Sequence, residues 1–158
     1  MLGTTQRETV SGQGLHLAIV CSLYNKKYTD AMLVAAQAVF TAAGAERVDV
    51  YRVPGAFEIP VVAAALARQS SKPNAIVCLG LIIQGETNHA DHIGSAVTEG
   101  LMQISIQTGV PCIHEVLTVK TEAQAQVRCV NPETNRGTEA AHTALEVALT
   151  LKSARTAA

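Results

Sequence analysis

The sequence predicts an α/β protein, a three-layer α/β/α sandwich built on a central four-stranded parallel sheet. Its hydrophobic periodicity switches repeatedly between strand-like and helix-like segments. Strands that alternate with helices indicate βαβ crossovers, which place helices on both faces of a parallel sheet. One predicted strand, residues 75–83 (AIVCLGLII), is continuously apolar, as expected for a central strand that is covered on both sides.

The first part of the chain shows both periodicities in turn. Residues 15–23 are a short, mostly apolar run and predict the first strand. A helix over about 28–43 follows, with one apolar face and with Gly44 as its C-terminal stop. Residues 47–53 alternate polar and apolar side chains, several of them β-branched, and predict the second strand, which Pro54 ends.

Helices are predicted on either side of the apolar strand. Residues 57–69 predict a helix that tolerates Pro60 only in its first turn. The third helix has the clearest apolar stripe, with residues spaced for one helical face; they are Ile93, Ala96, Val97, Gly100, Leu101 and Ile104. Gly109 ends this helix, and Pro111 prevents its continuation.

The last part of the chain predicts a fourth strand and two more helices. Residues 112–119 are the strand, and 121–129 are a short helix. Residues 130–137 are predicted to be the longest loop. The final helix, over about 138–152, directs alanine and leucine side chains inward.

Composition limits the class of protein. The 158 residues show no repeat or linker and predict a single domain, 1–158, with residues 1–14 as an N-terminal arm. A net charge of −1 without a basic run excludes a nucleic-acid partner. There is neither a signal-peptide core nor an apolar run near the ~20 residues that span a bilayer. We therefore expect a cytoplasmic protein without a membrane partner, whose four cysteines, lacking metal-ligand spacing, are reduced structural thiols.

Polar and special residues follow three of the predicted strands. They are the segments 22–25 (SLYN), 53–58 (VPGAFE) and 84–89 (QGETNH). Because ligands collect outside the carboxyl ends of the strands of such sheets, these three segments should line one rim. This convergence is the strongest functional signal that the residues give by themselves.

The segment Gly85-Glu86-Thr87 has two interpretations. A glycine permits close backbone approach, a hydroxyl can donate, and a helix starts soon afterwards, which together predict an anion site of backbone N–H groups. The alternative is an ordinary helix cap by Thr87 or Asn88.

The cluster His89, Asp91 and His92 also has more than one interpretation. A histidine near neutral pH can move protons. The same cluster could hold a metal ion, although no third nitrogen or sulfur ligand has matching spacing. Finally, the histidines could simply lie in the exposed first turn of a helix.

The few aromatic residues and isolated charges are ambiguous as well. Tyr24 and Phe57 are either core residues or rings that stack on a planar ligand, and we favour the ligand. Glu58 either accepts hydrogen bonds from a polyol or stabilises a helix start. Arg128 and Arg136 are solvated charges unless the fold, or a neighbouring subunit, brings them to the rim.

Three motifs together resemble the lumazine synthase family. They are VPGAFEIP (53–60), LGLIIQGETNHADHI (79–93) and the tail LTVKTEAQAQVRCVNPETNRGTEAAHTALEV (117–147), and the similarity extends over about 15–152. The resemblance implies a flavodoxin-like fold and a transferase of riboflavin biosynthesis without cofactor or metal. Its two small-molecule substrates would be 5-amino-6-(D-ribitylamino)uracil and 3,4-dihydroxy-2-butanone 4-phosphate. Its products would be 6,7-dimethyl-8-ribityllumazine, inorganic phosphate and water.

The resemblance also assigns roles to residues. His89 matches the proton-transfer histidine. Arg128 matches the cationic partner of the substrate phosphate, which would lie on Gly85, Glu86 and Thr87. The remaining positions match the residues that bind the pyrimidine and its ribityl chain within one subunit: Tyr24, Asn25, Ala56, Phe57, Glu58, Leu81, Ile82 and Ile83. Others match positions that line the site or reach it from the adjacent subunit: His114, Arg128, Arg136 and Glu139.

Four positions depart from the family pattern: Tyr24 stands for Phe or Trp, Ala90 for an aromatic residue, His114 for Phe and Arg136 for Lys. These departures concern affinity and rate rather than the reaction. Two other functions stay open, a metal-dependent hydrolase and a non-catalytic flavin- or pterin-binding module.

The implied assembly is a homo-oligomer with active sites at subunit interfaces. It would be a cyclic pentamer, a decamer of paired pentamers or a 60-subunit icosahedral capsid. Its N-terminal arm could add an edge strand to a neighbouring subunit.

Overall fold

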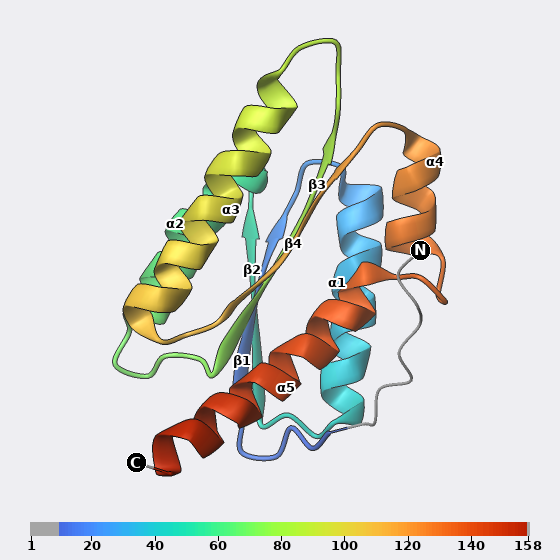
Figure 1. Cartoon of the computed structure of the whole chain (residues 1–158). Coiled ribbons are helices and arrows are strands. Elements are labelled where there is room, and N and C mark those ends of the chain that lie inside the picture. Colours follow the sequence, from blue (N-terminus) through green and yellow to red (C-terminus); the bar gives the residue numbers. More distant parts are fainter. Residues whose placement is uncertain (1–9, 158) are drawn as a thin grey trace.

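A computed structural model describes residues 10–157, so residues 1–9 of the predicted N-terminal arm lie outside the described part of the chain. The described residues form one sheet of four parallel strands in the order β2-β1-β3-β4, with helices on both faces (Figure 1). The predicted three-layer α/β/α class is therefore confirmed.

The four strands lie close to where the sequence places them. β1 (His16–Ser22) is one residue shorter at each end than predicted. β2 (Arg47–Val53), β3 (Ala75–Ile83) and β4 (Cys112–Val119) have the predicted bounds. β3 is buried along nearly its whole length between β1 and β4, as its continuous apolar run indicates.

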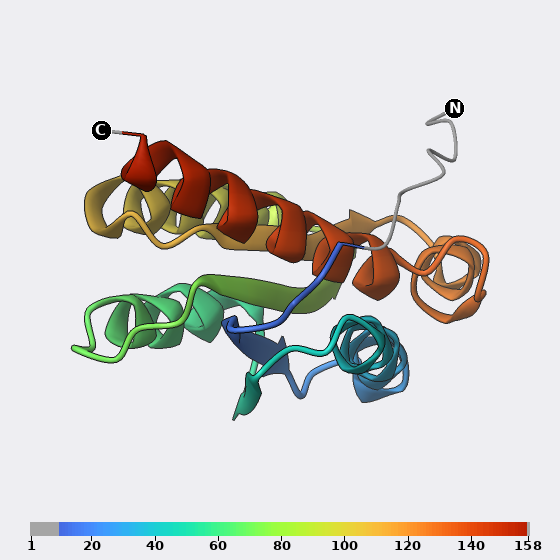
Figure 2. The ribbon, with the colours of Figure 1, turned by 90° about the horizontal axis from the view of Figure 1, so that it is seen from below.

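Helices cover the two faces of this sheet in two groups (Figures 1 and 2). One face is covered by α2 (Ile59–Ala67), which packs on β1 and β3, and by α3 (His89–Thr108), which packs on β3 and β4. The other is covered by α1 (Lys26–Ala42) and α5 (Arg136–Thr156), which pack on each other and on β3, with the short α4 (Glu122–Ala125) beside them. None of the described helices is long and apolar enough to cross a membrane.

The core consists of two apolar clusters, one on each face of the sheet. Successive strand residues alternate between them, so that Val77 and Leu79 face α1 and α5 while Ile76 and Cys78 face α2 and α3. Aliphatic and alanine side chains dominate both clusters, and the largest fully buried side chain is Phe40. All four cysteines are free thiols, and Cys21, Cys78 and Cys129 are buried while Cys112 is partly exposed.

The helix starts differ from the predicted ones. The predicted helix 57–69 is a 3₁₀ turn over Ala56–Glu58 followed by α2, with Pro60 in the first turn as expected. The predicted helix 121–129 is α4 followed by a π-helical turn, η2 (Gln126–Val130).

The prediction for the loop before the last helix was wrong. α5 begins at Arg136 rather than near 138, because Asn135 caps it by accepting the N–H of Gly137 at 2.8 Å. The connection before it is therefore only residues 131–135, and the connection 68–74 between α2 and β3 is longer. Two helix stops are confirmed, since Gly44 and Gly109 have positive φ angles of 70° and 69°.

Candidate active site

A cavity of about 1000 Å³ lies at the carboxyl ends of β1, β2 and β3. Residues from all three predicted segments line it: Tyr24, Asn25, Ala56, Phe57, Glu58, Gly85, Thr87 and His89. β1 lies between β2 and β3 in the sheet. The connection from β1 therefore leads to β2 on one side of it, and the connection from β2 leads to β3 on the other side. Crevices in open α/β sheets form at such a reversal of strand order. The predicted convergence of the three segments is therefore confirmed.

The turn from β1 to α1 presents Tyr24 and Asn25 to the cavity. Asn25 has left-handed backbone angles (φ 57°), and its Nδ2 donates to the carbonyl oxygen of Leu81 at 2.7 Å. The N–H groups of Leu23 and Tyr24 donate to the carbonyl oxygens of the last residue of β2 and of the residue after it, at 2.7 and 2.9 Å. These hydrogen bonds fix the backbone at Tyr24, and 74% of the surface of this residue is exposed. Because of this exposure, Tyr24 is not a core residue in the described chain.

The turn after β2 presents Ala56, Phe57 and Glu58. It is a 3₁₀ turn that Glu58 stabilises, because its Oε2 accepts the N–H of Gly55 at 2.9 Å. One carboxylate oxygen of Glu58 is thus used inside the turn. Phe57 is 61% exposed and lines the cavity, which again excludes the core interpretation. Two rings, Tyr24 and Phe57, therefore lie at adjacent strand ends with room for a planar group.

The end of β3 offers backbone groups along one edge. β3 pairs with β4 as far as Ile83, but its pairing with β1 ends at Leu79. Residues 81–83 line the cavity, and on the β1 side Asn25 occupies the carbonyl of Leu81. A strand edge of this kind can hydrogen-bond a flat heterocycle in the way that it would bond another strand.

The segment after β3 leads into an open helix N-terminus. Asn88 occupies the N-cap position of α3, yet its side chain makes no capping hydrogen bond. The first N–H groups of a helix need partners, and together with the helix dipole they favour an anion. A Cβ built on Gly85, which lines the cavity, would meet no atom within 4 Å, so the space beside it is free for a ligand.

The two histidines lie in the exposed first turn of α3 and also line the cavity. His89 is the first residue of the helix, and His92 is the fourth. Asp91 does not line the cavity. Within residues 10–157 no group of three or more His, Cys, Asp or Glu side chains is arranged to hold a metal ion.

Five of the predicted site residues do not line this cavity: Glu86, His114, Arg128, Arg136 and Glu139. Glu86 is exposed on the loop beside it. Arg128 is exposed on η2, and Arg136 and Glu139 lie in the first turn of α5. The ring of His114 on β4 faces α3, where its Nε2 is 2.8 Å from the hydroxyl of Thr98.

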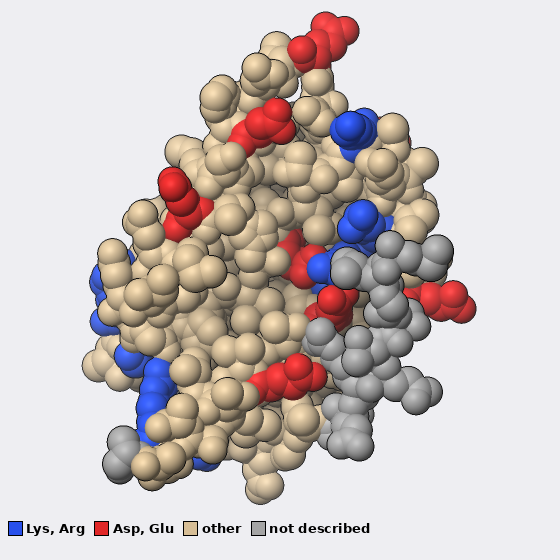
Figure 3. All heavy atoms as spheres, viewed as in Figure 1, with Lys and Arg blue, Asp and Glu red and all other residues tan. Residues whose placement is uncertain are grey.

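Arg136 is part of a charged cluster beside β4. Its Nε donates to Glu115 at 2.8 Å, and its Nη1 donates to Glu139. Figure 3 shows acidic and basic side chains next to each other near the place where α5 begins, on a face that is otherwise largely uncharged. Burial raises the pKa of Glu115 more than the guanidinium of Arg136 lowers it. Arg136 is therefore a paired, half-buried charge. The alternative that it is simply a solvated charge does not hold for this residue.

The sequence did not assign every residue of this site to it. Gly55 of the predicted rim segment, Ala90 and His92 also line the cavity, and so do Ile93 and Ala96, for which the sequence predicted no place in the site. Ile93 and Ala96 were assigned to the buried stripe of the third helix, although Ala96 is exposed. Both follow His89 at helical spacing, which was the available signal. Glu115 was missed too; the signal there was a single carboxylate inside the otherwise apolar end of a strand.

Comparison with known proteins gives a consistent result. A family model described as 6,7-dimethyl-8-ribityllumazine synthase matches residues 14–152. A protein of that name from Mycolicibacterium vanbaalenii is 43% identical over 152 residues, which is 95% of each chain. One from Mycobacteroides abscessus is 46% identical over 144 residues, covering 90% of this chain and 88% of the relative. One from Thermococcus onnurineus is 43% identical over 141 residues, covering 89% and 91%.

Proposed function

This chain belongs to the 6,7-dimethyl-8-ribityllumazine synthase family, and we propose that the cavity at the ends of β1, β2 and β3 is its active site. The enzyme condenses 5-amino-6-(D-ribitylamino)uracil with 3,4-dihydroxy-2-butanone 4-phosphate and releases phosphate and water. The product, 6,7-dimethyl-8-ribityllumazine, is the penultimate compound of riboflavin biosynthesis. The observation that supports the location is the gathering of ring, strand edge, helix N-terminus and imidazole around one cavity.

The pyrimidine substrate would bind between the rings and the strand edge. Tyr24 stacks on the ring, and the backbone groups of residues 81–83 other than the Leu81 carbonyl, which Asn25 occupies, bond its polar side. Asn25 fixes the turn that presents Tyr24. The ribityl hydroxyls then lie along Ala56, Phe57 and Glu58, where the second carboxylate oxygen of Glu58 is an acceptor for them.

The phosphate substrate would bind at the start of α3. Its phosphate lies on residues 85–87 at the open N-terminus of the helix, where backbone N–H groups and the helix dipole favour a dianion. His89 is the first residue of that helix, so its ring lies beside the phosphate site and on the cavity. The two substrates therefore meet between Tyr24 and His89.

The reaction needs proton transfers more than it needs a strong nucleophile. The amine of the pyrimidine attacks the ketone, and an imine forms as water leaves. Phosphate is then eliminated, and ring closure releases a second water. His89 accepts and returns protons in these steps, which contributes on the order of 10²–10⁴ in rate. Holding the two substrates in the right orientation supplies much of the remainder.

The cavity by itself lacks a cation for the phosphate. Its lining residues within the described chain include Glu58 but neither lysine nor arginine. Arg128 and Arg136 lie on η2 and α5, which cover the opposite face of the sheet from α3. These arginines, with His114 and Glu139, would serve the cavity of an adjacent copy. We infer a cyclic pentamer, alone, paired as a decamer or built into a 60-subunit shell, in the cytoplasm.

A mixing experiment with two variants tests whether sites are shared between copies. His89→Asn damages the cavity, and Arg128→Ala damages the half-site that would come from the neighbour. In a ring that contains both variants at random and in equal amounts, about one interface in four joins an intact cavity to an intact arginine. Co-assembled variants should therefore exceed the mean activity of the two separate variants when the phosphate substrate is scarce. Activity equal to that mean would show that each copy carries its own complete site.

The function is tested by mixing the two substrates with purified protein and following the absorbance of the lumazine product. A flavin- or pterin-binding module would bind the ribityl compound without forming product, and a metal-dependent hydrolase would need added metal. Light scattering on the same preparation measures the size of the assembly. Product formed in the presence of a chelator supports the synthase, and no product with both substrates saturating would refute it.

A further inference from the structure

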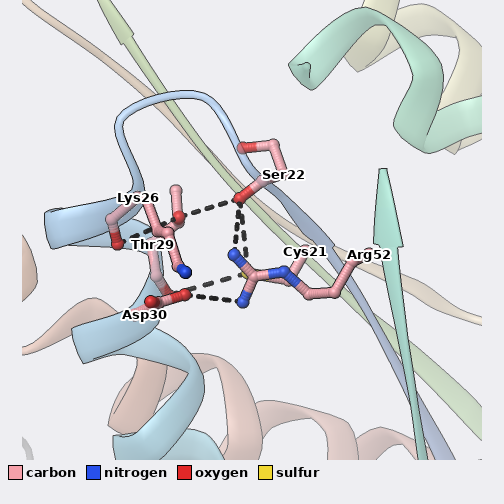
Figure 4. A network of polar contacts seen from close by, with 6 residues as sticks. All are labelled: Cys21, Ser22, Lys26, Thr29, Asp30 and Arg52. Atoms are coloured by element: carbon pink, nitrogen blue, oxygen red, sulfur yellow. Dashed lines mark hydrogen bonds and ion pairs between the residues drawn. The ribbon is translucent and has the colours of Figure 1, made fainter. Parts of the chain in front are cut away.

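We propose that Arg52, which does not line the cavity, is a positioning residue that fixes the Tyr24–Asn25 turn for the pyrimidine substrate. This inference rests on the proposed function. Arg52 is the residue before the last of β2, and its side chain reaches across to the end of β1 (Figure 4). There it bridges the two ends of the turn that presents Tyr24 and Asn25.

The contacts of Arg52 connect both sides of the turn. Its Nη1 donates to Asp30 of α1 at 2.6 Å, and its Nη2 donates to the carbonyl oxygen of Ser22, the last residue of β1, at 3.3 Å. The hydroxyl of Thr29 donates to the same carbonyl at 2.8 Å. One guanidinium therefore connects the residue immediately before the turn to Asp30, the fifth residue of the helix that follows the turn (Figure 4). Charge-assisted hydrogen bonds are the stronger ones, which suits such a bridge.

Arg52 also connects two of the three segments that form the cavity. The two residues that follow it in the chain, Val53 and Pro54, accept the N–H groups of Leu23 and Tyr24 through their carbonyl oxygens. The turn that follows presents Phe57 and Glu58. A displaced Arg52 would therefore loosen the contact between the two ring-bearing turns without touching residues 85–89, where the phosphate would bind.

Features of the site indicate that the bridge is kept for position rather than for stability. Two polar atoms here are buried without a hydrogen-bond partner in the described chain: the Nε of Arg52 and the hydroxyl oxygen of Ser22. Unsatisfied buried polar atoms are costly and few in folded proteins, so this bridge is not the arrangement that stability alone would favour. Asn25 adds a left-handed backbone conformation to the same turn.

The test compares Arg52→Met with Arg47→Met. Both substitutions remove an arginine of β2 that pairs with an aspartate, but Arg47 pairs with Asp49 at the opposite end of the strand, away from the cavity. In the Arg52→Met enzyme we expect KM for the pyrimidine substrate to rise about fivefold, about 1 kcal/mol. KM for the phosphate substrate and kcat should stay within about twofold, and Arg47→Met should leave all three unchanged.

Two further measurements separate positioning from general damage. In a Tyr24→Ala background, Arg52→Met should change KM for the pyrimidine by much less than fivefold, because the ring that it positions is gone. Amide hydrogen exchange at Leu23 and Tyr24 should be faster in Arg52→Met than in the wild type. Equal rises in both KM values, additive effects with Tyr24→Ala, or unchanged exchange would each overturn the proposal. A wild-type enzyme that forms no product would instead refute the function, while the exchange result still decides whether Arg52 fixes the turn.

Discussion

Replacing Gly137 with alanine is expected to destabilise the protein, although alanine favours helices more than glycine does. Gly137 lies in the first turn of α5, directly against α1. A Cβ built there would lie 2.1 Å from the carbonyl oxygen of Met32 and 2.7 Å from its C and Cα atoms. The gain from helix propensity is about 1 kcal/mol, so the clash decides the sign of the effect.

The size of the effect follows from how far the helices must move. Cβ atoms essentially never approach other atoms within 3.0 Å, and α5 must therefore shift by about 0.9 Å (3.0 − 2.1 Å) or lose its first turn. Overpacking of this kind costs about 1–3 kcal/mol, and loss of the Asn135 cap costs about 0.5–2 kcal/mol. Together the two costs are about 1.5–5 kcal/mol, and subtracting the propensity gain leaves an expected loss of about 0.5–4 kcal/mol, whose midpoint of about 2 kcal/mol corresponds to about 4–8 °C in Tm.

Thermal unfolding followed by circular dichroism measures this loss. Wild type and variant are compared at one protein concentration, because association makes Tm depend on concentration. Gly85→Ala is the matched control, since its new methyl group meets no atom within 4 Å and should leave Tm within about 1 °C. A Gly137→Ala protein as stable as the wild type would contradict the close α1–α5 packing.

Three other substitutions have separable outcomes. His89→Asn should lower kcat by on the order of 10²–10⁴ and leave residual activity; an unchanged kcat would remove the proton-transfer role. Gly85→Ala should raise KM for the phosphate substrate about tenfold, because its methyl group enters the space beside the helix N-terminus, and KM for the pyrimidine should not change; equal changes in both would contradict this. Burial raises the pKa of Asp49, but hydrogen bonds from His16 and Arg47 outweigh it, and the net pKa is lowered. A lowered pKa stabilises the fold above the unfolded-state value, so Asp49→Asn should cost up to about 1 kcal/mol at neutral pH. In denaturant titrations this difference should vanish as the pH falls through the lowered pKa, and a difference that persists in acid would refute the assignment.

The strands were predictable because their signal is local. β2, β3 and β4 are apolar or alternating runs bounded by proline, glycine or polar residues, and their predicted bounds match the structure. Helix starts were less predictable where they have functional residues. α3 begins at His89, four residues before Ile93, the first residue of its apolar stripe. Three of the four residues of its first turn are exposed and only Ala90 packs in the core, so hydrophobic periodicity cannot detect this turn.

The site was predictable where topology alone determines it. Parallel strands end at a common edge, so the segments after β1, β2 and β3 had to approach each other whatever their side chains. Partners that depend on side-chain packing were not predictable in the same way. Arg136 pairs with the buried Glu115, a contact between α5 and β4 that neither residue type nor spacing specifies.

Stability and function favour different things in α1 and in the turn that precedes it. In its second turn, at Met32, α1 packs closely against Gly137 of α5, and a substitution there is judged by packing alone. Before its N-terminus, the turn contains a left-handed Asn25, and the buried hydroxyl of Ser22 lacks a partner in the described chain, each at a cost of about 1–3 kcal/mol. Asn25→Gly would relieve the backbone strain but remove the bond to Leu81 that connects the turn to β3. Glycine at position 25 would therefore give the more stable turn, whereas asparagine gives the better-defined cavity. This chain has the asparagine.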